Sequence, residues 1–190
     1  MLYSALKNAL RRFRKDERGT IMVETVIALP LLVWALAASY EFFEVHRYMS
    51  ARDKATYTIA DMFSREVSSI NTAYMDNTKI LFDEISNDQG VNQIRVSIIK
   101  FDEETNSYSI SWSEVRGIGD FIALTSADVA QAFNELPIMN DGEELILVES
   151  QSTYQPLFNV GLTDNLSIDT RVFTSPRFSP QICWETQACG

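Results

Sequence analysis

"GTIMVETVIALPLLVWALAASY", residues 19–40, is the stretch that decides the fold of this chain. Glu24 is its only charged residue. At a rise of about 1.5 Å per residue, a helix over this stretch would be about 33 Å long, which matches a bilayer core of about 30 Å. Pro30 predicts a bend rather than an end, because the apolar run continues to Ala38. The sequence therefore predicts a membrane-spanning helix over 20–40.

The charges on either side of this stretch predict its orientation. Six basic residues stand against two acidic ones before Thr20, whereas Glu41 and Glu44 follow the apolar run. Basic flanks favour the cytoplasmic side of a membrane. Residues 1–19 are therefore expected to form a basic cytoplasmic leader, and the chain from residue 41 onward to lie outside the cytoplasm. The formal net charge of -10 argues against nucleic acid as a partner.

Two other interpretations of the apolar stretch stay open. A core helix of a soluble domain can be equally apolar, although the length and the basic flank favour a membrane span. A cleaved secretory signal is the second alternative, because "WALAAS" offers small residues at Ala35 and Ala37 in the pattern of a cleavage site. Glu24 inside the apolar run and the lack of a helix breaker before that site oppose it.

A helical pattern continues beyond the span. We expect one long helix from Thr20 to about Ser69, which resumes after a break near Asn71 and runs to Ser86. Its part over 41–86 is expected to be amphipathic and extracytoplasmic, because a stripe of mostly apolar residues recurs every three or four positions. The stripe consists of Val45, Tyr48, Met49, Arg52, Ala55, Ile59, Phe63, Val67, Ile70 and Tyr74.

After Gly90 the pattern changes to alternating apolar and polar residues, which predicts strands. The expected strands lie over 91–101, 107–115, 143–158 and 166–175, and the first two form a hairpin. Ser126 is a good N-cap for a short helix over 126–136. The expected fold class is α+β: a long N-terminal membrane-spanning helix, its amphipathic extension, and a small antiparallel sheet domain over 87–190 with one short helix.

Cys183 and Cys189 lie near the end of the chain. In an exported domain they would be oxidised to a structural disulfide that closes a short loop in the C-terminal tail. A metal site is the weaker interpretation, because no histidine lies near them. A redox site is also weaker, because their spacing is not the two-residue gap of thiol oxidoreductases.

The sequence lacks the pattern of an enzyme active site. His46 is the one histidine, and no phosphate loop, metal-ligand cluster or nucleophile elbow is present. "RGIGDF", residues 116–121, is best interpreted as a turn. The acidic groups of 102–104 and 141–144 lack the loop spacing of a calcium site. We therefore expect no catalytic residue, no metal and no cofactor.

The segment "RRFRKDERGTIMVETVIALPLL", residues 11–32, resembles the processing site of type IV prepilins. A basic leader ends in a glycine, and a glutamate opens the apolar helix five residues later. The chain is most similar to TadE-like proteins, minor pseudopilins of the tight adherence (Tad, Flp) pilus system. "TYQPLF" and "TSPRF" also resemble the closing strands of TadE/TadG-like proteins. Thr25 stands where the major pilins of this system tend to have an aromatic residue, and the outer domain is too large for a major pilin. No insertion matches the metal-binding adhesion domain of longer TadG-like relatives.

The resemblance implies roles for three residues. A prepilin peptidase would cut between Gly19 and Thr20, and Glu24 would act in recognition and assembly. In a bundle of such helices, Glu24 of one subunit can pair with the new amine of Thr20 in the next, which would fix axial register.

The resemblance also implies a location and partners. It places the chain in the bacterial inner membrane as a single-pass protein with a periplasmic C-terminal domain. Its partners would be other pilins or pseudopilins and the Tad assembly platform. The alternative function is a single-pass membrane-anchored periplasmic binding or sensory domain outside any pilus.

Overall fold

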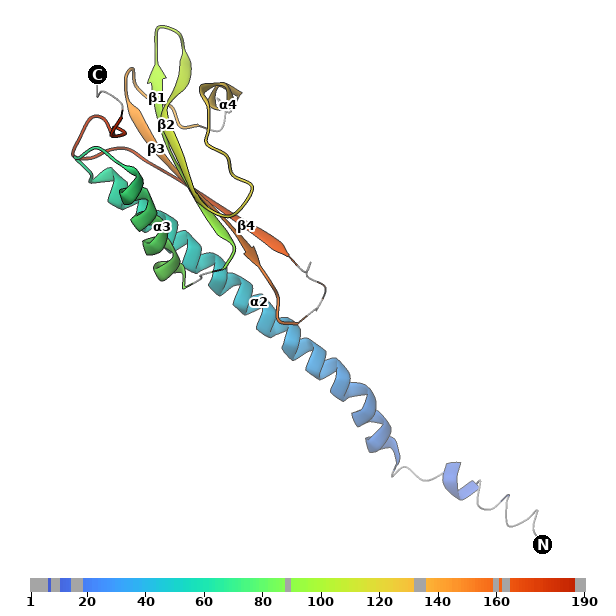
Figure 1. Cartoon of the computed structure of the whole chain (residues 1–190). Coiled ribbons are helices and arrows are strands. Elements are labelled where there is room, and N and C mark those ends of the chain that lie inside the picture. The colour runs from blue at the N-terminus through green and yellow to red at the C-terminus, as the bar shows by residue number, and fades with distance from the viewer. Residues whose placement is uncertain are drawn as a thin grey trace.

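The computed structural model describes residues 7, 11–14, 19–87, 90–131, 136–158, 161 and 165–186. A long helix leads into a small four-stranded antiparallel sheet with a short helix, so the expected α+β fold is confirmed (Figure 1). The elements in chain order are α2 (Thr20–Ser64), α3 (Thr72–Ser86), β1 (Asn92–Asp102), β2 (Ser107–Gly117), α4 (Ser126–Gln131), β3 (Glu144–Tyr154) and β4 (Leu166–Thr174).

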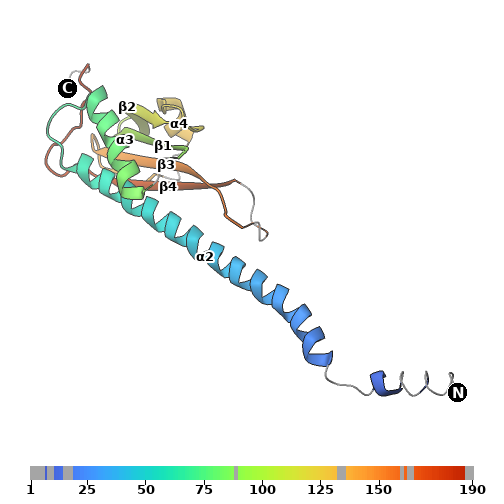
Figure 2. The ribbon, with the colours of Figure 1, turned by 60° about the horizontal axis from the view of Figure 1, so that its bottom comes forward.

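α2 is one continuous helix of 45 residues. Pro30 lies inside it without ending it. Figures 1 and 2 show that the N-terminal half projects as a stalk, whereas the C-terminal half lies along the sheet. Buried residues of α2 begin at Glu41 and include Arg52, Ile59 and Phe63. The predicted stripe therefore packs on the sheet over the second half of the helix.

The predicted break between two helices is present and has its own hydrogen bonds. α2 ends at Ser64. The Glu66 carboxylate accepts backbone N–H groups, and the one from Ser68, at 3.0 Å, is the main reason that the pKa of Glu66 lies below its ordinary value. The Asn71 side chain then caps α3 by accepting the N–H of Tyr74 at 2.9 Å. The amphipathic segment is thus two helices.

The sheet has the strand order β2-β1-β3-β4, and neighbouring strands are antiparallel. α2 and α3 cover one face, where the main core lies. Ile98 marks the centre of this core, because it pairs with Trp112 in β2 and with Ile146 in β3. The strand residues of this core are Ile94, Val96, Ile98, Trp112, Ile146, Val148 and Val172.

The opposite face of β1 is polar in sequence but is also buried. Gln93 and Arg95 are at most 9% exposed there, because the segment 118–125 and α4 lie over this face. "RGIGDF" is therefore the start of a covering segment rather than only a turn. Gly119 allows the close approach, since a Cβ at this position would lie 2.6 Å from the Gln93 side-chain oxygen.

The C-terminal tail closes the end of the domain away from the stalk. The backbone N–H of Arg177 donates to the carbonyl of Ser64 at 2.8 Å, and the N–H of Ile70 donates to the carbonyl of Cys183 at 2.8 Å. The Trp112 indole N–H donates to the carbonyl of Ile182 at 2.7 Å. The tail therefore joins the break between the helices to strand β2.

Candidate functional site: helix α2 and its junction with the sheet domain

The expected processing position lies at the start of α2. Gly19 is the residue before the first helical residue, Thr20. Its φ of -80° and ψ of -16° are open to any residue, and a Cβ at this position would meet nothing within 4 Å. The fold therefore does not require glycine at position 19. A reason for glycine has to be sought in whatever binds this segment.

Glu24 lies just over one turn into α2, and its side chain is exposed. Its helical neighbours are also exposed, with Ile21 at 73% and Ile27 at 62%. Within the part of the chain that the structure describes, Glu24 has no hydrogen-bond or ion-pair partner. The partner expected for it, the Thr20 amine of a neighbouring subunit, would come from another chain. The assembly role of Glu24 therefore stays a prediction.

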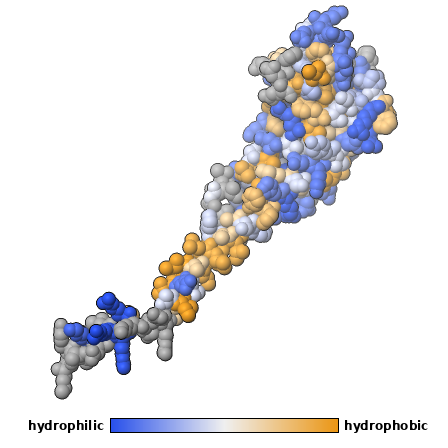
Figure 3. All heavy atoms as spheres, turned by 180° about the vertical axis from the view of Figure 1, so that it is seen from behind, coloured by the Kyte–Doolittle hydropathy of each residue, from blue (hydrophilic) through white to orange (hydrophobic). Residues whose placement is uncertain are grey.

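The first half of α2 is long and apolar enough to cross a membrane, and none of its apolar window is buried within the structure. Figure 3 shows this half as an apolar stalk below the more polar sheet domain. Full exposure argues against the core-helix interpretation, because a core helix would be covered by the rest of the fold. The side of the membrane that the sheet domain occupies stays a prediction.

No family model, curated protein or solved structure matches this chain. The TadE-like resemblance therefore rests on the sequence motifs alone.

The junction between the stalk and the sheet domain is built around Glu41. This residue directly follows the apolar stretch, and its side chain is completely buried. The Tyr154 hydroxyl at the end of β3 donates to one carboxylate oxygen at 2.8 Å. The backbone N–H of Phe158 donates to the other at 2.6 Å. The carboxylate thus ties α2 to the segment after β3.

The same contact changes the properties of Tyr154. Burial, followed by the hydrogen bond to Glu41, raises the pKa of the Tyr154 hydroxyl above its ordinary value. The Tyr154 ring lies edge-on to Tyr48, with ring centroids 5.0 Å apart, and the Arg52 guanidinium lies over the Tyr48 ring. One turn further, the hydroxyls of Thr56 and Ser150 are 3.0 Å apart. The contact between α2 and β3 therefore has a polar seam beside its apolar core.

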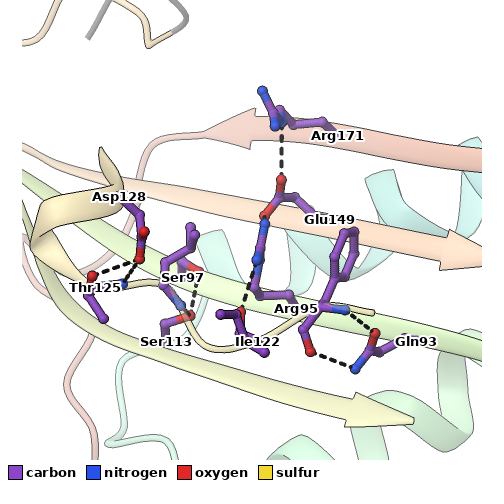
Figure 4. A network of polar contacts seen from close by, with 11 residues as sticks. Gln93, Arg95, Ser97, Ser113, Ile122, Thr125, Asp128, Glu149 and Arg171 are labelled. Carbon is purple, nitrogen blue, oxygen red and sulfur yellow. Dashed lines mark hydrogen bonds and ion pairs between the residues drawn. The ribbon is translucent and has the colours of Figure 1, made fainter. Parts of the chain in front are cut away.

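A second polar network lies on the opposite face of the sheet (Figure 4). The Arg95 guanidinium donates to Glu149 at 2.6 Å and to the carbonyl of Ile122 at 2.9 Å. Arg171 donates to the other oxygen of Glu149 at 3.1 Å. Arg95 also lies 4.5 Å from the ring centroid of Phe121. These contacts hold the covering segment 118–125 to β1 and β3, which is a structural role.

The acidic groups near the β1–β2 turn come together without forming a cation site. Asp141 accepts the backbone N–H of Glu103 at 3.0 Å. Glu144 is buried and accepts the backbone N–H of Ile182 at 2.9 Å. Among the described residues, no group of three His, Cys, Asp or Glu side chains is placed to hold a metal.

The remaining candidates lie far apart. His46 is exposed on α2 and packs edge-on against Phe42, with ring centroids 4.5 Å apart. Cys183 is partly buried in the tail that packs on Ile70. Cys189 lies outside the described residues, so the disulfide stays a prediction.

Sequence reasoning treated Glu41 only as a flanking charge. One signal was available, because a carboxylate directly after a membrane span and one turn before Glu44 is costly unless it has a partner. Its partners, Tyr154 and Phe158, are more than a hundred residues away in sequence. No local pattern could identify them.

Proposed function

We propose that this chain is an assembly protein of a Tad-type pilus, a TadE-like minor pseudopilin. The first half of α2 anchors it in the bacterial inner membrane, and the sheet domain lies in the periplasm. The observation that carries the proposal is Glu24, an exposed carboxylate in the apolar stalk with no partner in the described part of the chain. Hydrocarbon is a poor solvent for such a group, so it needs a partner from outside.

The start of α2 offers that partner. Cleavage after Gly19 by a prepilin peptidase would give Thr20 a charged amine at the first position of the helix. A neighbouring helix displaced by about one turn would bring this amine to the level of Glu24. Pairing would neutralise both groups and fix the axial offset between subunits. The continuous α2 would then carry the sheet domain at a set height above the bundle.

The test compares Glu24→Gln with Glu44→Gln in cells that assemble the pilus. Both variants remove one carboxylate from α2, but Glu44 is paired with Arg47 within the chain, outside the apolar stretch. We expect Glu24→Gln to insert and fold normally while pilus assembly and co-purification with other pseudopilins fall. Glu44→Gln should assemble as the wild type does. Wild-type assembly by Glu24→Gln would contradict the proposal.

Processing is tested separately with Gly19→Ile. A branched side chain fits the fold at this position, where a Cβ meets no atom within 4 Å, but it should not fit a peptidase that accepts glycine. The mature wild type should begin at Thr20 by mass spectrometry, and the variant should keep its leader. A start at Met1 in the wild type would refute cleavage, and a start at Ala38 would support the secretory-signal alternative.

A membrane-anchored binding domain is the second candidate function. An open hollow lies between β3 and the segment after β2, and Asp120, Gln151 and Asn165 line it. The buried Ser152 hydroxyl also faces this region, and within the described residues it makes no hydrogen bond. The Gln151 side chain already accepts the N–H of Asp120 at 2.9 Å. The Gln151 oxygen is thus used within the fold rather than left for a ligand.

A further inference from the structure

The base of the sheet domain carries exposed apolar side chains beside the end of the stalk. Leu157, in the segment that connects β3 to β4, is 72% exposed, and Phe158 is 43% exposed. On α2, Tyr40 is 50% exposed and Phe43 is 71% exposed. The rings of Tyr40 and Phe158 meet edge-on, with centroids 5.9 Å apart. Two distant segments therefore meet at one apolar surface, here called the basal patch: Tyr40, Leu157 and Phe158.

We propose that the basal patch is a second membrane contact, in which Leu157 and Phe158 enter the interface of the bilayer that α2 crosses. The partner that the basal patch contacts is a lipid surface. This inference rests on the membrane insertion within the proposed function, but not on a role in a pilus.

The height of the patch along α2 supports a lipid partner. Tyr40 is the last residue of the apolar stretch, and Phe158 contacts its ring. The next residue, Glu41, is buried, and charged side chains that reach solvent begin one turn later, with Glu44 and Arg47 paired to each other. The patch therefore lies where the helix passes from hydrocarbon to water. Aromatic side chains are most favourable at this level of a membrane. Tyr40 joins the patch to the apolar stalk that Figure 3 shows in orange.

Glu41 explains how the patch keeps this height. Its carboxylate accepts the N–H of Phe158 at 2.6 Å and the hydroxyl of Tyr154 at 2.8 Å. The two bonds fix the segment after β3 against α2, so Leu157 is held beside the stalk rather than left free. The lower end of β3 lies beside α2 in Figure 1, where Tyr154 contacts Glu41 and Tyr48. A domain held at two points against the bilayer has a fixed tilt, whereas one held by the helix alone does not.

The test uses tryptophan quenching by brominated phosphatidylcholine in vesicles that also contain phosphatidylglycerol. The native Trp34, 58% exposed in the stalk, first reports whether α2 is in the bilayer. Leu157→Trp is then placed in a Trp34→Phe background, with Phe158→Trp as a second reporter. Ile138→Trp is the matched control, because Ile138 is 100% exposed and follows Pro137, whose carbonyl accepts the Tyr108 hydroxyl near the β1–β2 turn, at the opposite end of the domain. Trp112 and Trp184 are common to all samples.

We expect brominated lipid to quench the reporters at 157 and 158 and to leave the Ile138→Trp sample close to the Trp34→Phe parent. The emission of both basal reporters should also shift to shorter wavelength on reconstitution. Quenching no greater than that of Ile138→Trp would overturn the inference while Trp34 quenching still supports the membrane span. Unquenched Trp34 would overturn the membrane span and, with it, this inference. If the emission of the basal reporters changes with the protein-to-lipid ratio but not with brominated lipid, the patch binds a second copy of the chain instead of lipid.

Discussion

Replacing Tyr154 by phenylalanine removes one of the two donors to a buried carboxylate and changes little else. The Glu41 side chain is completely buried and Tyr154 is 6% exposed, so water does not easily replace the lost hydroxyl. A hydrogen bond to a charged group contributes about 1.5–3 kcal/mol to stability. We therefore expect Tyr154→Phe to lower the free energy of unfolding by about 2 kcal/mol, a large share of a typical 5–15 kcal/mol.

The assay is urea unfolding of the full chain in detergent micelles, followed by near-ultraviolet circular dichroism of the sheet domain. Tyr57→Phe is the matched control, because Tyr57 lies on α2, the helix that carries Glu41, but is 64% exposed. Its loss should cost less than about 0.5 kcal/mol. A double-mutant cycle with Glu41→Gln should give a coupling energy of about 1 kcal/mol or more, because the two side chains are in contact.

The pH dependence of the same variant checks the sign of the interaction. The folded pKa of Tyr154 lies above its unfolded value, because burial favours the neutral hydroxyl. Its contribution is therefore complete below the unfolded pKa of about 10 and is lost as pH rises toward the folded pKa. The difference between wild type and Tyr154→Phe should be constant from neutral pH to about 10 and shrink above it. A cost equal to that of Tyr57→Phe, or a difference that grows above that pH, would refute this account of the junction.

Three other measurements address the sheet domain and its tail. Burial raises the pKa of Glu144, so the stability that Glu144 contributes is complete below its unfolded pKa and is lost as pH rises. Glu144→Gln should therefore be more stable than wild type at neutral pH. Urea titrations should show that this gain vanishes in acid. Glu149→Gln should cost about 3 kcal/mol in urea unfolding, because a buried arginine loses its counter-charge, whereas Arg171→Gln, at the exposed end of the network, should cost less than about 1 kcal/mol. In protein matured in the periplasm, Cys183 and Cys189 should resist alkylation until a reductant is added, and labelling without reductant would contradict the disulfide.

The strands could be predicted from sequence because their signal is local. The first strand was expected over 91–101 and lies at Asn92–Asp102, and the second was expected over 107–115 and lies at Ser107–Gly117. In both strands, successive side chains point to opposite faces of the sheet, so the alternation of residue types predicts the strand without knowledge of its partner. The strand order could not be predicted, because β1 pairs with β3 across a long connection.

The burial of the polar face of β1 could not be predicted either, because it depends on contacts between segments far apart in the sequence. Gln93 looks like a solvent-facing residue in an alternating strand. In the structure its side-chain amide both donates to the carbonyl of Phe121 at 3.0 Å and accepts its N–H at 2.7 Å. Ser113 likewise accepts the N–H of Leu124 at 2.9 Å. Polar residues are buried here because they satisfy the backbone of a covering segment, and such a role leaves no periodic signal.

The two carboxylates of the stalk separate what one chain can satisfy from what needs another. Glu41 has two donors from its own sheet domain, at 2.8 and 2.6 Å, and so it can be buried at the end of the apolar stretch. Glu24 lies within the apolar stretch, where desolvation costs more, yet the described part of its own chain supplies no donor. The positions one turn away on α2 are Thr20, Ile21, Ile27 and Ala28, so none of them carries a basic side chain. For the alternative function, a membrane anchor that acts alone, the described residues supply no partner for Glu24. Under the proposed pseudopilin function, a neighbouring subunit at the correct axial offset would bring the Thr20 amine to Glu24, and every other offset would leave the carboxylate unpaired.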